Sequence, residues 1–197
     1  MDTLGPLATE LETLSARHGF VFYRGVGQIF RGVYLLSAGQ IDEAETAIRD
    51  GFEVHMLRNG GKLFYSFYAW KLGEVLLAAG HPAESDRLMS QAMDVCLDHQ
   101  DRAYLGELLD VQGRARQALG DVEGAEESLR SAMSTALALG AVPARIRATT
   151  HLAELLEQSG RSRAAFDVLD RMLRALDKMT GFGGLNRALA LRARLTT

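Results

Sequence analysis

The chain has 197 residues, of which 47 % are hydrophobic and 24 % are charged, the balance of a folded soluble protein rather than a disordered one. Its net charge of −3 and its pI near 6.0 give no electrostatic basis for binding nucleic acid or an anionic membrane. The lone Cys96 cannot form a disulfide within the chain, no signal peptide is evident, and no stretch has the roughly 18–20 uninterrupted apolar residues of a membrane span. We therefore expect a cytoplasmic protein that binds neither nucleic acid nor membrane.

Turn signals recur about every twenty residues and form two interleaved sets. The first set is Gly39, Gly80, Gly120 and Gly160. The second set is Gly19, residues 59–61, residues 99–101, Gly140 and Gly181. Each segment between turns has the length of one long helix, so two segments form a repeat of about forty residues. Such a period is typical of a solenoid, in which each unit buries its apolar face against its neighbours.

The predicted elements follow this rhythm along the chain. Residues 7–18 are expected to form a helix within an N-terminal segment, 1–19, that is either a capping helix or a half-repeat cut from a longer chain. Four helix-pair repeats follow at 20–60, 61–100, 101–140 and 141–180, and a capping segment at 181–197 carries a last helix at 185–195. The fold prediction is an all-α solenoid of about ten helices, eight of which form four antiparallel pairs stacked in a right-handed superhelix.

Three columns of residues keep a constant distance from the first set of turn glycines. The residues seven before and five after the turn are small, and the residue nine after it is bulky and apolar. Glycine inside a helix costs about 0.5–1 kcal/mol relative to alanine, so its recurrence predicts that the paired helices approach closely there. In a fourth column, four residues before the turn, Arg116 departs from leucine. The three columns are Gly32, Gly73, Gly113 and Ala153; Ala44, Ser85, Ala125 and Ala165; and Ile48, Met89, Leu129 and Leu169.

These columns resemble the tetratricopeptide repeat (TPR), from about residue 20 to residue 179. The period of about forty residues, rather than the thirty-four usual in that family, implies helices that are a turn longer. Segments 35–44, 144–153 and 180–182 are similar to the TPR-like C-terminal arms of large bacterial signalling proteins. Those arms follow an AAA-type or STAND-type ATPase module, sometimes with a class III nucleotide cyclase domain or a transcription-factor head. The resemblance implies a sensor or scaffold arm of a bacterial signalling system.

No residue pattern predicts chemistry. The five histidines have no metal-ligand spacing, and Cys96 is expected to be a buried, inert thiol. The segment 181–184 is rich in glycine but lacks the preceding strand and the Gly-Lys-Ser/Thr ending of a phosphate loop. We expect a protein that is not an enzyme and has no cofactor and no metal.

The TPR resemblance implies a concave face lined by the first helix of each pair. Its exposed stripe would fall thirteen, ten, nine, six and three residues before each turn glycine, apolar at the N-terminal end and charged at the C-terminal end. Trp70 with Phe67 would be the apolar anchor for a protein or peptide partner, and the charged residues would set register and specificity. The places comparable to the lysines and asparagines of a carboxylate clamp hold Ile29, Val33, Trp70 and Glu74, which argues against such a clamp. The candidate groove residues are Phe67, Trp70, Lys71, Glu74, Asp110, Arg114, Arg147 and His151.

Two alternatives stay open. The aromatic residues crowded between 64 and 70 either pack as core or form a patch that receives a partner, and we expect Phe64 and Tyr68 to be core and Trp70 to be surface. The function is either that of a non-catalytic interaction scaffold or that of a ligand- or peptide-binding regulatory domain that controls an attached or partner ATPase, cyclase or transcription factor. Homodimerisation is left open.

Overall fold

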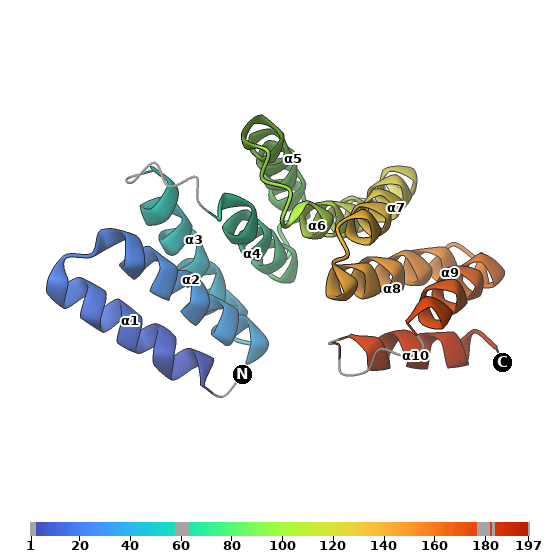
Figure 1. Cartoon of the computed structure of the whole chain (residues 1–197), viewed down its shortest axis with the longest axis horizontal. Coiled ribbons are helices and arrows are strands. Elements are labelled where there is room, and N and C mark those ends of the chain that lie inside the picture. Colours follow the sequence, from blue (N-terminus) through green and yellow to red (C-terminus); the bar gives the residue numbers. More distant parts are fainter. Residues whose placement is uncertain (1–2, 58–63, 177–181, 183, 197) are drawn as a thin grey trace. The chain divides into compact units, whose positions relative to one another are not determined.

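The computed structural model describes residues 3–57, 64–176, 182 and 184–196, with the side chains of 55–57 left out. In this part of the chain all regular structure is α-helical, and no strand occurs (Figure 1). The helices are α1 (Leu4–His18), α2 (Val21–Ser37), α3 (Ile41–Leu57), α4 (Tyr65–Ala78), α5 (Pro82–His99), α6 (Leu105–Ala118), α7 (Val122–Ala138), α8 (Val142–Gln158), α9 (Ser162–Ala175) and α10 (Leu185–Arg194).

The helices belong to two compact units. Unit 1, Met1–Gln100, contains α1 to α5, and unit 2, Asp101–Thr197, contains α6 to α10. Helices α1, α2 and α3 run in alternating directions (Figure 1), and the predicted pairs α2/α3, α4/α5, α6/α7 and α8/α9 all pack together. Helix α1 covers α2, and α10 packs on α8 and α9. The prediction of an all-α fold of about ten helices is confirmed, whereas the sense of the superhelix stays a prediction.

Glycine ends most of the helices in the left-handed conformation. Gly39, Gly80, Gly120 and Gly160 have φ values of 78°, 82°, 85° and 76°. This conformation is costly for a residue with a Cβ, so the turn needs glycine at these positions. Gln100 takes the same role after α5 with φ 56°. The predicted turns at 59–61 and Gly181 lie outside the described residues.

The two columns of small residues and the column of bulky residues meet at one contact between the paired helices, as the first and third pairs show. A Cβ added to Gly113 would lie 2.6 Å from Leu129 Cγ and 3.1 Å from the carbonyl oxygen of Ala125. One added to Gly32 would lie 2.9 Å from the carbonyl oxygen of Ala44 and would overlap Ile48. The backbones therefore approach as closely as the columns predicted. In the second pair the Ser85 hydroxyl also donates to the carbonyl oxygen of Gly73 at 3.1 Å.

Arg116, the departure from the leucine column, belongs to a polar network between α6 and α7. Its guanidinium donates to Ser128 Oγ at 3.0 Å and to the Gly124 carbonyl oxygen at 3.4 Å. Ser128 Oγ in turn donates to Gln112 Oε1 at 3.3 Å. Hydrogen bonds thus satisfy the polar atoms at positions where the second pair carries apolar side chains. The corresponding residues of that pair are Leu72, Leu76 and Leu88.

We predict opposite effects for the same substitution at two buried glycines of α6. Gly106→Ala should stabilise by up to about 1 kcal/mol, because alanine favours the helix and its Cβ would lie no closer than 3.5 Å to its neighbours. Gly113→Ala should destabilise by about 1–3 kcal/mol, because its Cβ overlaps Leu129 in a filled core. Urea unfolding of both variants measures the difference. Equal shifts in the same direction would show that the small-residue column does not control packing.

Candidate functional site

The predicted groove stripe lies on α2, α4, α6 and α8, the first helix of each pair, which we call the inner helices. The stripe is less exposed than the sequence suggested. Each of its residues is either buried or half-buried. Ile29 and Val111 have 0 % exposure, so the expectation that they belong to an exposed stripe is wrong. Ile29 points instead toward α3, where a Cβ added to Gly51 would lie 2.8 Å from its Cγ1. The stripe residues are Val26, Ile29, Phe30, Val33 and Leu36; Phe67, Trp70, Lys71, Glu74 and Leu77; Glu107, Asp110, Val111, Arg114 and Gln117; and Arg147, Thr150, His151, Glu154 and Glu157.

In unit 1 the inner helices carry an aromatic group that we call the inner aromatic cluster: Phe30, Phe67 and Trp70. The ring of Phe67 lies 5.8 Å from that of Phe30 across α2 and α4, and 5.8 Å from that of Trp70, edge to face. Lys71 Nζ lies 3.4 Å from the centre of the Trp70 ring and 3.0 Å from Glu74 Oε2. Four of the predicted groove residues thus form one contiguous, half-buried group on α4.

The neighbouring aromatic residues divide differently from the prediction. Tyr68 is buried, with 4 % exposure, as expected of a core residue. Its burial raises the pKa of the hydroxyl. Phe64 is 55 % exposed, so its assignment to the core is wrong. It precedes α4 with a left-handed φ of 58°, and its side chain therefore does not follow the helix face.

In unit 2 the predicted groove residues bind one another. Asp110 Oδ1 lies 2.8 Å from His151 Nδ1, and these side chains are 6 % and 11 % exposed. One helical turn away, Arg147 Nη2 donates to Glu107 Oε1 at 3.0 Å. Burial raises the pKa of Glu107, and Arg147 opposes that rise. Asp110, Arg147 and His151 therefore join α6 to α8, while Arg114 lies half-buried on α6.

The polar pairing continues along the inner helices of unit 2. Gln117 Nε2 donates to Gln158 Oε1 at 2.8 Å between α6 and α8. Between α8 and α10, Glu154 accepts two hydrogen bonds from Arg187, at 2.9 and 2.7 Å, and Glu157 accepts two from Arg194. We call these contacts, with the two pairs above, the inner polar ladder. Sequence reasoning missed it, although opposite charges one repeat apart, as at Glu107 and Arg147, were the available signal.

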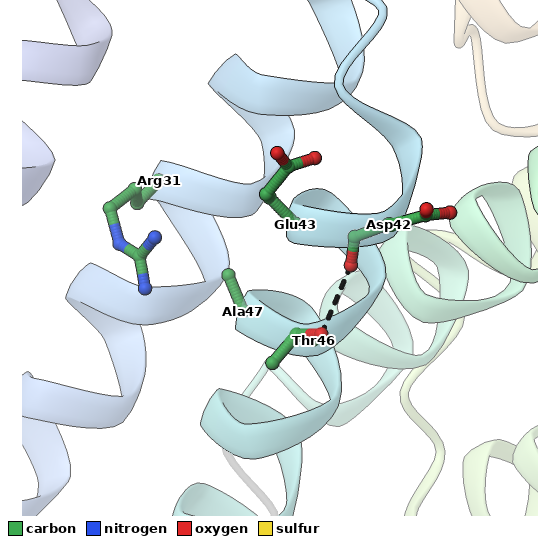
Figure 2. Close-up of a pocket in the computed structure, with 5 residues that line it drawn as sticks. All are labelled: Arg31, Asp42, Glu43, Thr46 and Ala47. Carbon is green, nitrogen blue, oxygen red and sulfur yellow. Dashed lines mark hydrogen bonds between the residues drawn. The ribbon is translucent and has the colours of Figure 1, made fainter.

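A shallow depression of about 430 Å³ lies between α2 and α3 and has charged side chains in its lining. Figure 2 shows that the Arg31 guanidinium and the carboxylates of Asp42 and Glu43 point in different directions. Arg31 Nε is already bound to Glu12 of α1 at 2.8 Å, and the Thr46 hydroxyl donates to the Asp42 carbonyl oxygen at 3.0 Å. The charged groups therefore do not converge on a ligand.

Among the residues that the structure describes, no group of three or more His, Cys, Asp or Glu side chains is placed to hold a metal ion. Cys96 is buried, with 1 % exposure, as predicted. The same part of the chain contains no helix whose length and apolar character would let it cross a bilayer.

Comparison with known proteins identifies the fold. No family model and no curated protein sequence matches the chain. The crystal structure of BtubC (BKLC) from P. vanneervenii superposes with a TM-score of 0.74 and 12 % identity, over 98 % of this chain and 82 % of that one. Nearly identical TPR-like repeats assigned to a kinesin light chain of Podosopora anserina superpose with a TM-score of 0.67 and 17 % identity, over 87 % and 85 % of the two chains. The chain therefore has a TPR-like α-solenoid fold.

The carboxylate of Glu107 should give stability a distinctive pH dependence. Its pKa is raised above the ordinary 4.5 by burial, so the folded state holds the proton more tightly than the unfolded state, and stability is lost as pH rises from about 4.5 through the raised pKa. Glu107→Gln removes this loss. Its free energy of unfolding relative to the wild type should therefore rise with pH above 4.5 and then level off in urea unfolding series.

Glu126→Gln is the matched control, with the opposite sign. The hydrogen bond from Arg161 lowers the pKa of Glu126, so the stability that this carboxylate contributes is lost only as pH falls below the ordinary 4.5. The difference between this variant and the wild type should be constant above 4.5 and shrink below it. Parallel pH profiles for the two variants would contradict the assigned environments.

Proposed function

We propose that the chain is a non-catalytic interaction module and that the inner aromatic cluster of unit 1 binds a protein or peptide partner. The observation that carries this proposal is the position of Phe67 and Trp70, which stand half-buried on an inner helix rather than in the core. Large aromatic side chains contribute the most binding energy per residue at protein interfaces. The TPR-like fold supports the proposal in general terms, since such folds are commonly interaction scaffolds.

The surroundings of Trp70 favour binding because they hold its ring in place. Phe67 contacts the ring edge to face, and the Lys71 ammonium covers one face of the indole at 3.4 Å. The Lys71 position is itself fixed by Glu74. A side chain that is already ordered loses little conformational entropy when a partner covers it, so more of the contact energy appears as affinity.

The charged residues have different roles in the two units under this proposal. Lys71 and Glu74 border the aromatic cluster and set the register and specificity of the partner. In unit 2, Arg114 remains the best candidate for a specificity contact. Asp110, Arg147 and His151 would contribute to partner binding only by exchanging the partners they have in the inner polar ladder. Removing one member of a buried charged pair is costly, so we assign these three mainly to helix stacking.

The cellular setting belongs to the same proposal. The sequence resemblance to TPR-like arms of bacterial signalling proteins supports a cytoplasmic sensor or scaffold arm. The rival is a regulatory domain that binds a small ligand and controls an ATPase, cyclase or transcription factor. Thermal-shift screening separates the two: a metabolite that raises the melting temperature by several degrees favours the rival, and stabilisation by a protein partner alone favours the scaffold.

Trp70→Ala tests the proposed surface. It should weaken binding to a partner identified by affinity capture by about 2 kcal/mol or more, measured by isothermal titration calorimetry, because a hot-spot contact is lost. It should lower the free energy of unfolding by less than the roughly 3–5 kcal/mol that is lost when a fully buried tryptophan is replaced by alanine. Phe166→Ala, a half-buried aromatic residue of α9 beside Arg163, is the control and should leave affinity unchanged. A Trp70→Ala protein that unfolds much more easily yet binds normally would make the cluster part of the core.

A further inference from the structure

A separate pocket of about 190 Å³ lies in unit 2, between the outer helices α7 and α9 at the start of α8. Its apolar wall comes from α7 and α9, and two arginines and a serine complete it. Leu137 is 58 % exposed and extends the apolar surface beyond the pocket. The lining residues are Met133, Ser134, Leu137, Arg145, Val168, Arg171 and Met172.

At the corresponding place between the first two repeats, two aromatic rings pack together. Phe52 stands thirteen residues after Gly39, as Met133 does after Gly120, and Tyr65 stands fifteen before Gly80, as Arg145 does before Gly160. The rings of Phe52 and Tyr65 pack with their centres 5.8 Å apart, and burial raises the Tyr65 pKa. In unit 2 a flexible methionine, Met133, and an arginine, Arg145, stand where unit 1 has this aromatic pair, and both line the pocket.

The pocket is lined by two arginines, Arg145 and Arg171, and is positively charged. Arg145 and Arg171 make no ion pair and no side-chain hydrogen bond with any residue that the structure describes, and no acidic residue lines the pocket. The nearby acids of α9 are already paired, Asp167 with Arg163, and Asp170 with Arg174 and Arg192. A guanidinium binds a carboxylate through charge-assisted and often bidentate hydrogen bonds. The rim therefore favours an acidic ligand.

We propose that this pocket binds an acidic peptide segment in which one large apolar side chain enters the pocket while flanking carboxylates bind Arg145 and Arg171. The volume is below the roughly 300–1,000 Å³ of typical small-molecule sites and has room for a single large side chain. The exposed Leu137 beside it offers further contact to a chain that continues across the surface. The site lies on α7, α8 and α9, so it does not depend on the function proposed for the inner aromatic cluster on α2 and α4.

Fluorescence anisotropy with the full chain tests this proposal. The probe is the fluorescein-labelled peptide Asp-Glu-Asp-Leu-Glu-Asp-Glu, compared with a peptide that has glycine in place of leucine and with one in which asparagine and glutamine replace the acids. The first peptide should bind most tightly, and added salt should weaken it. Arg171→Gln should raise its Kd about tenfold or more, since a hydrogen bond to a charged group is lost. Arg17→Gln, the same change on the exposed surface of α1, should leave the Kd unchanged.

A double substitution that copies residues of the first repeat junction is designed to close the pocket. Met133→Phe with Arg145→Tyr copies the aromatic pair of the first repeat junction and should abolish peptide binding. Arg171→Gln, at an exposed position, keeps the test valid if the double variant does not fold. The proposal is overturned if the acidic leucine peptide does not bind, or if it binds all variants equally. Octanoate serves as a probe for a simple fatty acid, and the proposal is also overturned if octanoate binds and the peptide does not. It is overturned as well if sedimentation experiments show that the double variant loses only its self-association.

Discussion

The close contact between the two helices of each pair is the constraint on which the rest of the structure depends. Where Gly32 or Gly113 faces the backbone after the turn, there is no room for a Cβ, and the bulky residue nine positions after the turn closes over the contact. Buried helical glycine lowers helix propensity, so close packing must offset that loss. Once the pairs of unit 2 are fixed in this way, α6 presents a defined stripe of residues to α8. That arrangement brings Glu107 within hydrogen-bonding distance of Arg147.

The two units use this frame for different surfaces. In unit 1 the inner helices α2 and α4 meet through aromatic rings, and the cation of Lys71 lies over Trp70. In unit 2 the inner helices meet through hydrogen bonds and ion pairs, of which Asp110 with His151 is well buried. Exposed pairs such as Glu157 with Arg194 each add little to stability. Together with the contacts between α6 and α8, they connect α6, α8 and α10. The apolar surface of unit 1 is therefore the better candidate for a partner, whereas the charges of unit 2 mainly hold its own helices.

The sequence predicted those parts of the structure that repeat with the chain. The columns of Gly32, Ala44 and Ile48 were visible because each repeat imposes the same local contact, and the turn glycines followed from the need for a left-handed residue. Contacts that depend on three-dimensional detail were not predicted. The exposure of Phe64 depends on a backbone angle outside the helix, and the pairing of Asp110 with His151 depends on the distance between two repeats. The pocket beside Met133 was missed because it depends on which side chains fill one junction.

The accessibility of Trp70 can be measured directly, because it is the only tryptophan in the chain. Acrylamide quenching of its fluorescence reports whether solvent reaches the indole in the folded protein. If the inner aromatic cluster is a binding surface, quenching of the free protein should be intermediate between that of the urea-unfolded chain and that of a buried indole, and the bound partner should reduce it further. A Trp70 that is fully shielded in the free protein, with quenching that the partner does not change, would contradict the assignment of this surface to binding.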